Sequence, residues 1–141
     1  MNTALVYTDG KYVQFTNAPV PLEEVGGSQA YKDISGGRLP GISKWTHSLG
    51  GEFSFSENLL GMKGKYFVAL DSFYRSAFSS SPSPSQFLNV DGYSLLNGRL
   101  GFRADNGFSV VFWSRNLTNK NYFEQLLPAG GSSGYFVAVL G

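Results

Sequence analysis

The sequence of 141 residues fits one domain of ordinary size, but its composition is not that of an average soluble protein. Charged residues make up 15% and aromatic residues 16%, whereas soluble domains carry about 25% charged residues. The formal net charge of +1, without a lysine or arginine cluster, excludes electrostatic binding of nucleic acid. With no cysteine and a single histidine, His47, the chain also lacks the parts for common zinc sites and thiol or triad catalysis.

No stretch of the sequence is apolar for long enough to form a membrane-spanning helix. The longest apolar runs are residues 66–70 and 135–140, far below the roughly 20 residues that such a helix needs. The first residues also lack the basic and apolar regions of a secretion signal. If the chain belongs in a membrane, we therefore expect it to cross as β-strands.

Alternation of apolar and polar residues predicts the strands. Residues 3–17 are rich in strand-forming residues, but their alternation slips at Asp9 and Gly10, where we expect a bulge or tight bend. Residues 44–56 and 64–78 alternate more regularly. Each places most apolar side chains on one face and most polar side chains on the other, which predicts a two-faced sheet.

The second half of the chain continues this pattern. Residues 94–104 and 108–115 alternate in the same way, and the Asp-Asn-Gly sequence at 105–107 is typical of a tight hairpin. Residues 135–140 form a last extended segment, and helical periodicity is nearly absent. We therefore predict an all-β fold, an antiparallel meander of about six strands.

The connections between these strands alternate between long and short. Long loops are predicted at residues 18–43, 79–93 and 116–134, and short turns at 57–63 and 104–107. Because successive strands of a meander are antiparallel, all long loops lie at one end of the sheet. Outer-membrane β-barrels have this asymmetry, with long extracellular loops and short periplasmic turns. The predicted strands also reach the roughly 9–11 residues that a tilted membrane strand requires.

Aromatic and charged side chains fit the same interpretation. Aromatic residues near the strand ends correspond to the interfacial girdles of a membrane barrel; they are Tyr12, Phe15, Trp45, Phe53, Phe55, Tyr66, Tyr74, Phe78, Tyr93 and Phe108. Charged residues on the opposite face would line a hydrated interior; they are Lys65, Asp71, Arg75, Arg99 and Arg103.

Two motifs resemble the C-terminal part of the barrel of TonB-dependent outer-membrane receptors. Residues 38–49 are similar to the family's L-P-x-x-P-x-h…L entry into a late strand, although Ser43 stands where a second proline is usual. Residues 116–122 are similar to N-L-(F/T)-(D/N)-K-x-Y, found shortly before the family's C-terminus. The resemblance covers essentially the whole chain, and its motif residues are Leu39, Pro40, Trp45, Asn116, Leu117, Lys120 and Tyr122.

The resemblance implies a segment of a 22-stranded barrel in the outer membrane of a Gram-negative cell. Such receptors contain a plug domain and import a scarce extracellular ligand, often a ferric siderophore, with energy supplied through TonB. The implied partners are outer-membrane lipid, the remainder of the barrel with its plug, TonB through an absent N-terminal region, and a small extracellular ligand. We expect a fragment without signal, plug or closing strand, which does not transport by itself and uses no cofactor.

Ligand contacts would come from the long loops and the interior charges, because loops on a rigid scaffold carry recognition. The candidates are Tyr31, Phe87, Tyr93, Arg75, Arg99 and Arg103. For the charged residues, pairing with neighbouring strands is the simpler explanation. We expect His47 to be an interfacial side chain rather than a metal ligand, and Glu23 and Glu24 to be solvated loop residues.

Residues 116–122 predict the point at which a strand leaves the membrane. Asparagine and threonine side chains there would satisfy backbone groups where the strand ladder ends, and Tyr122 would lie at the interface. No nucleophile elbow, phosphate loop or histidine–carboxylate arrangement is present, so we expect no enzymatic activity and predict no catalytic or metal-binding residue.

The main alternative is a soluble, secreted β-sandwich that binds carbohydrate through Trp45 and Trp113. In a sandwich, Leu96, Leu100 and Phe102 would pack against a second sheet instead of lipid. A small eight-stranded barrel is a third alternative, for which the sequence predicts too few strands.

Overall fold

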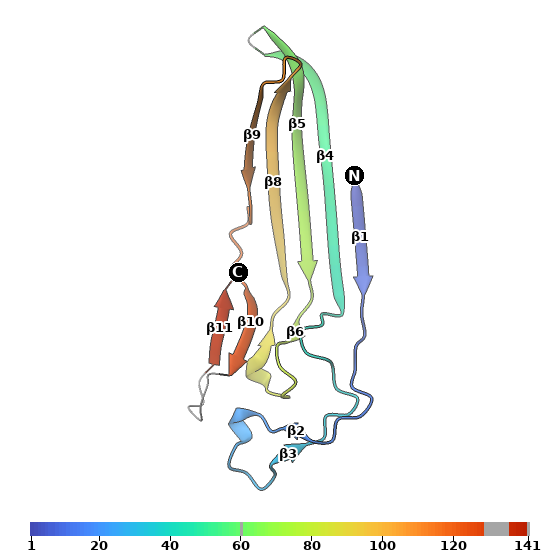
Figure 1. The fold of residues 1–141 in the computed structure, drawn as a ribbon, viewed down its shortest axis with the longest axis vertical. Helices are drawn as coiled ribbons and strands as arrows, with labels where there is room; N and C mark the ends of the chain where they lie inside the picture. The colour runs from blue at the N-terminus through green and yellow to red at the C-terminus, as the bar shows by residue number, and fades with distance from the viewer. Residues whose placement is uncertain (60, 129–135, 141) are drawn as a thin grey trace. The chain divides into compact units, whose positions relative to one another are not determined.

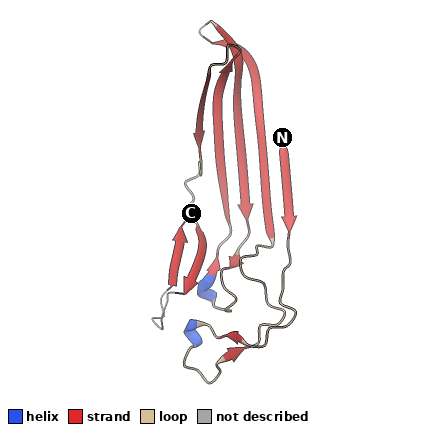
Figure 2. Ribbon diagram, viewed as in Figure 1, coloured by secondary structure: helices blue, strands red, loops and turns tan. Residues whose placement is uncertain are grey.

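The computed structural model describes residues 1–59, 61–128 and 136–140, and it shows an all-β chain (Figure 2). Strands make up 54% and helix 4%, so the predicted all-β class is confirmed. The main sheet is antiparallel and has five strands in the order β1-β4-β5-β8-β9 (Figure 1). These strands follow one another along the sheet in chain order, as in the predicted meander.

The bounds of these strands follow the alternating segments. The five strands are β1 (Asn2–Tyr7), β4 (Trp45–Leu59), β5 (Met62–Arg75), β8 (Tyr93–Ala104) and β9 (Ser109–Ser114). A sixth long segment, β11 (Phe136–Leu140), is not part of this sheet. It pairs with β10 (Phe123–Pro128) in a separate antiparallel pair. The meander therefore contains five strands where about six were expected.

The chain divides into two compact units. The first unit comprises residues 1–5, 46–74 and 94–120 and contains most of the main sheet. The second comprises residues 6–45, 75–93 and the chain from Asn121 onward, and contains the long connections.

The first predicted strand is shorter in the structure than in the sequence analysis. β1 ends at Tyr7, and the following segment leaves the strand at the predicted irregularity. The Tyr12 N–H donates to the Gly37 carbonyl at 2.9 Å, and the Leu39 N–H donates to the Gly10 carbonyl at 3.0 Å. Because these bonds join the segment to a later part of its own loop, residues 8–17 do not extend β1.

Two of the predicted long loops contain short elements. The loop at 18–43 contains β2 (Ala18–Pro19), the 3₁₀ helix η1 (Leu22–Glu24) and β3 (Tyr31–Lys32), and β2 pairs with β3. The loop at 79–93 follows the first residue of β6 (Phe78–Ser79) and contains η2 (Gln86–Leu88) and β7 (Asn89–Val90). The buried apolar residues of these segments are Ala18, Pro21, Phe78, Leu88 and Val90.

The third long connection and the short turns also differ in extent from the prediction. β10 occupies residues 123–128 of the predicted loop 116–134, and the predicted residues 129–134 lie outside the described part. β4 and β5 extend into the predicted turn 57–63. The hairpin between β8 and β9 is tight: Gly107 has a φ of 92° and its N–H donates to the Ala104 carbonyl.

An aromatic residue that breaks the alternation of β5 packs on a glycine of β8. Phe67 falls on the otherwise polar side of its strand, yet it is only 2% exposed. A Cβ atom at Gly101 would lie 2.8 Å from Cε1 of the Phe67 ring. The absence of a side chain at Gly101 therefore provides the space in which Phe67 is buried.

We expect Gly101→Ala to lower the free energy of unfolding by about 1–3 kcal/mol, because the added methyl group meets the Phe67 ring and the Val110 carbonyl. Urea unfolding measures this change. Gly51→Ala is the matched control, since a Cβ at Gly51 meets no heavy atom within 4 Å and should change stability by less than about 0.5 kcal/mol. Equal stability of the two variants would contradict the packing.

Candidate functional site

The main sheet has one face that is apolar and largely exposed, which we call the apolar face. It is formed by Leu49, Phe53 and Phe55 of β4, Val68 and Leu70 of β5, Leu100 of β8, and Val110 and Phe112 of β9. Phe53 is 70% exposed, Phe112 64% and Leu100 54%. Contiguous exposure of this kind is rare on soluble monomers and marks a surface that contacts another apolar phase or molecule.

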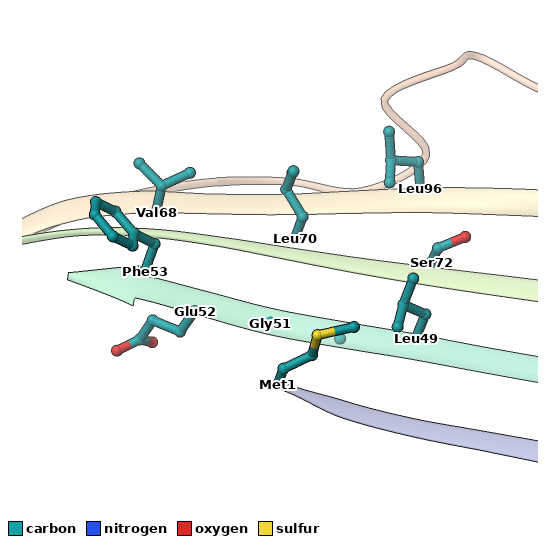
Figure 3. A pocket seen from close by; sticks show the side chains of 10 residues that line it. Met1, Leu49, Gly51, Glu52, Phe53, Val68, Leu70, Ser72 and Leu96 are labelled. Atoms are coloured by element: carbon teal, nitrogen blue, oxygen red, sulfur yellow. The ribbon is translucent and has the colours of Figure 1, made fainter.

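Two shallow depressions run along the apolar face. The first has a volume of about 580 Å³ and lies between β1, β4, β5 and β8. Figure 3 shows Phe53, Leu70 and Leu96 projecting from the same side of their strands, while Glu52 points away from them. The second depression, of about 520 Å³, includes Leu100 and Phe112, which are direct partners across the β8–β9 pair. The floor of both depressions is hydrocarbon.

Aromatic rings gather at two positions along the strands. Toward the short-turn end, the rings of Phe55 and Tyr66 stack at 5.4 Å, and Tyr66 lies 4.9 Å from Phe102. At the end of β1 and the start of β4, the rings of Tyr7 and Trp45 lie 4.6 Å apart. Within the first unit, the exposed aliphatic side chains of Leu49, Val68, Leu70 and Leu100 lie on the apolar face together with Phe53 and Phe112.

The opposite side of the sheet carries the charged residues, and we call it the polar face. Glu52, Lys65, Asp71, Arg99 and Arg103 lie on it, as the alternation predicted. The Arg103 guanidinium lies 3.8 Å from the Glu52 carboxylate and 4.1 Å from the centre of the Phe67 ring. Among the residues that the structure describes, Arg99 and Asp71 have no ion-pair partner within 4.0 Å.

His47 lies beside β1. Its Nε2 atom is 3.3 Å from the Thr3 hydroxyl of the neighbouring strand. The described residues contain no group of three or more histidine, aspartate and glutamate side chains that could hold a metal ion. They also contain no helix that is long and apolar enough to cross a membrane.

The Asn-rich segment after β9 forms a turn held by Asn116. The Asn116 side chain accepts a hydrogen bond from the Lys120 N–H at 2.8 Å and donates one to the Lys120 carbonyl at 3.0 Å. Asn116 and Asn119 have positive φ angles of 51° and 48°, which asparagine adopts more readily than most residues. The Asn116 N–H in turn donates to the Asn97 side chain at 3.0 Å, which attaches the turn to β8.

The same turn returns an apolar side chain to the sheet. The Leu117 N–H donates to the Leu96 carbonyl at 2.7 Å. A Cβ at Gly98 would lie 2.9 Å from Leu117 Cδ1 and 3.4 Å from Leu70 Cδ2. Leu117 and Leu70 therefore cover Gly98 from the apolar side, and the apolar face continues beyond the end of β9.

In the second unit, Arg75 joins the segment before β4 to the end of β5. Its Nε–H donates to the Ser43 hydroxyl at 2.7 Å, and its Nη2 donates to the Gly41 carbonyl at 2.6 Å. The guanidinium also lies 3.7 Å from the centre of the Phe78 ring. Ser43 is 7% exposed, so its hydroxyl is a nearly buried acceptor for the Arg75 guanidinium.

A second contact joins the two long loops. The Ser85 hydroxyl donates to the Glu23 carboxylate at 3.0 Å and accepts from the Phe87 N–H, which caps η2. The Lys32 ammonium lies 2.9 Å from the Glu24 carboxylate. Both glutamates are exposed, as expected, and each also has a partner within the loops.

The remaining ligand-contact candidates fall into two groups. Tyr31 on β3 and Phe87 on η2 have exposed rings. Tyr93 is 8% exposed and its ring stacks on that of Tyr122 at 4.4 Å. Because the Tyr122 ring covers one face of the Tyr93 ring, Tyr93 presents little surface to a ligand. Sequence reasoning did not identify the partners of Tyr93, Arg75 and Glu23, since each lies far away along the chain.

Asp33 lies in a local turn of the first long loop. The Ser35 hydroxyl and backbone N–H both donate to its carboxylate, at 2.6 and 2.9 Å. These bonds favour the charged form and hold the pKa of Asp33 below its ordinary value. The Ser35 hydroxyl also accepts from the Phe15 N–H at 2.9 Å, so the carboxylate fixes the loop indirectly.

Comparison of the chain with protein-family models, with curated proteins and with solved structures finds no match.

We expect Asn116→Gly to lower the free energy of unfolding by about 1–2 kcal/mol, because both side-chain bonds to Lys120 are lost while the positive φ is retained. Asn119→Gly is the matched control. It also places glycine at a positive φ, but among the described residues the Asn119 side chain makes no hydrogen bond that the change would remove, so the stability of this variant should equal or slightly exceed that of the parent. Urea unfolding compares the two, and equal effects would contradict the role of the Asn116 amide.

We expect Ser35→Ala to raise the pKa of Asp33 toward its ordinary value, as measured by the NMR titration of the Asp33 carboxyl carbon. Because the pKa is lowered in the folded chain, the carboxylate stabilises the loop above the unfolded pKa of about 3.9. That contribution disappears as the pH falls through the folded pKa. Below the folded pKa of Asp33, the stability of the loop should therefore differ less between the parent and Ser35→Ala. An unchanged Asp33 titration in the variant would show that the Ser35 hydroxyl does not lower this pKa.

Proposed function

We propose that this chain forms part of the wall of an outer-membrane β-barrel, of the TonB-dependent receptor type, which takes up a scarce ligand such as a ferric siderophore. The observation that carries the proposal is the exposed apolar face, with the charged strand residues on the opposite side. In a lipid-facing strand, charge at the bilayer centre costs about 2–4 kcal/mol for arginine or lysine. Lipid contact thus accounts for the sidedness of the sheet.

The dimensions of the apolar face support the same proposal. β4, β5 and β8 contain 15, 14 and 12 residues, more than the roughly 9–11 that a membrane strand requires. From Trp45 to Phe55, β4 extends about 33 Å at about 3.3 Å per residue. At a tilt of about 40° this distance spans about 25 Å, the height of the apolar band of such barrels.

The arrangement of connections is the second support. The turns β4–β5 and β8–β9 are short and join strands at one end of the sheet, whereas the long connections follow β1, β5 and β9. In the proposed orientation, the short turns are periplasmic and the long connections extracellular. The outer connections would then carry ligand contacts, with Tyr31 and Phe87 as the exposed aromatic candidates.

The carbohydrate-binding sandwich receives less support. A sandwich requires Leu96, Leu100 and Phe102 to be covered by a second sheet, but Leu100 is exposed, and Phe102 is buried where it contacts Tyr66. The two tryptophans also have separate surroundings: Trp45 contacts Tyr7, and Trp113 lies beside Arg115.

The partners of the proposed function follow from its parts. The apolar face contacts outer-membrane lipid, and the outer strands of the sheet pair with the remainder of the barrel. The polar face lines the interior, where a plug domain that contacts TonB would lie. The isolated chain is expected to insert or aggregate rather than to transport.

We expect the refolded chain to float with phosphatidylcholine vesicles in a density gradient, and Leu100→Arg to lose about 2–4 kcal/mol of folding free energy in vesicles. The matched control is Val111→Arg, at an exposed position of the polar face on the neighbouring strand. It should change the same quantity by less than about 0.5 kcal/mol. A monodisperse soluble monomer that does not float, or equal effects of the two arginines, would disprove the proposal.

A further inference from the structure

A small depression lies on the polar face beside β8 and β9. It has a volume of about 280 Å³ and is lined by Asp71 of β5, Asn97 and Arg99 of β8, Trp113 of β9, and Arg115 just beyond it. These side chains come from three adjacent strands of the same unit and lie on the side opposite the apolar face. The volume is near the lower limit of about 300 Å³ for ligand pockets, so it suits a small molecule or one end of a larger one.

The centre of this depression is an exposed indole ring that has two arginines as neighbours. Trp113 is 68% exposed. Arg99 is its direct partner across the β8–β9 pair, and the Arg115 guanidinium lies 5.7 Å from the ring centre. Both arginines thus stand beside the same flat apolar surface.

In this depression the Asn97 side chain has a hydrogen-bond partner, whereas the two arginines have no carboxylate partner among the described residues. Asn97 Oδ1 accepts from the Asn116 N–H, so the Asn116 turn fixes this wall. Among the described residues, neither arginine has a carboxylate within 4.0 Å, although Asp71 lines the same depression. Neither guanidinium is therefore neutralised by a carboxylate of the described residues, and both remain available to pair with an anionic ligand.

This combination of groups selects a definite chemistry. Guanidinium forks bind a carboxylate through paired, charge-assisted hydrogen bonds. An exposed indole offers a face for a flat or apolar ring. A simple inorganic anion would use only the arginines, and a neutral ring would use only the indole.

We propose that the Arg99–Trp113–Arg115 depression binds a small organic carboxylate that carries a flat or apolar ring. The inference deepens the proposed function by naming a ligand class, and it rests on that function only in that the polar face must stay open to water. Asp71 repels the ligand's charge and sets an upper limit on its negative charge.

Fluorescence of Trp113 tests the proposal in the full chain. Trp45→Phe leaves Trp113 as the only tryptophan, and the chain is refolded in zwitterionic detergent with its strand content checked by circular dichroism. Benzoate should change the emission saturably. Acetate, benzamide and inorganic phosphate, each lacking the ring, the charge or the flat apolar part, should bind at least about tenfold more weakly, the factor that about 1.4 kcal/mol produces.

Variants separate the recognition from a general effect on folding. Arg99→Gln and Arg115→Gln should each weaken benzoate binding about tenfold, and Arg→Lys at either position should restore only part of it. Asp71→Asn should tighten binding about twofold by removing repulsion. Lys65→Gln, outside the depression, is the control and should leave the affinity unchanged.

Each outcome supports or overturns the proposal. Benzamide binding as tightly as benzoate shows stacking alone, and phosphate binding as tightly shows a simple anion site; either result overturns it. Unchanged affinity in folded Arg99→Gln and Arg115→Gln chains also overturns it. The vesicle experiment tests the proposed function separately from the ligand site. If the chain does not float with vesicles, the benzoate titration is repeated in buffer without detergent, so that the depression is judged independently of membrane insertion.

Discussion

The separation of apolar and charged side chains onto opposite faces of one sheet is the constraint on which the rest of the structure depends. A strand turns successive side chains to opposite faces, so a single residue of slip would exchange the two environments. The register of β8 with β9, in which Leu100 faces Phe112, keeps both on the apolar side. The apolar face of such a sheet is removed from water only by contact with another apolar surface, whether lipid or protein.

The Asn116 turn shows how this constraint is met at the end of a strand. After β9 ends, the Lys120 N–H and carbonyl are bonded by the Asn116 side chain instead of by a neighbouring strand. The turn then places Leu117 over Gly98. Residues 116–120 thus both satisfy backbone groups after the end of β9 and cover Gly98 on the apolar face.

The sequence was sufficient to predict the elements that depend on local alternation, and insufficient for those that depend on distant partners. β4, β5, β8 and the hairpin before β9 follow from period-two patterning and the Asp-Asn-Gly turn. The burial of Phe67 could not be predicted, because it requires Gly101 on the next long strand. The ladder ends at Tyr7 because the following segment bonds to the end of its own loop, which no alternation reveals.

The candidate site was predicted in part for the same reason. Arg99 was assigned to the polar face from its parity alone, but its position opposite Trp113 depends on the strand register. Arg75 was grouped with the interior charges, whereas it binds Ser43 and Gly41. These bonds join the segment before β4 to the end of β5 in the absence of any ligand. Connections that already hold one another have little conformational entropy left to lose, so a molecule that bound them would meet a smaller ordering cost than on free loops.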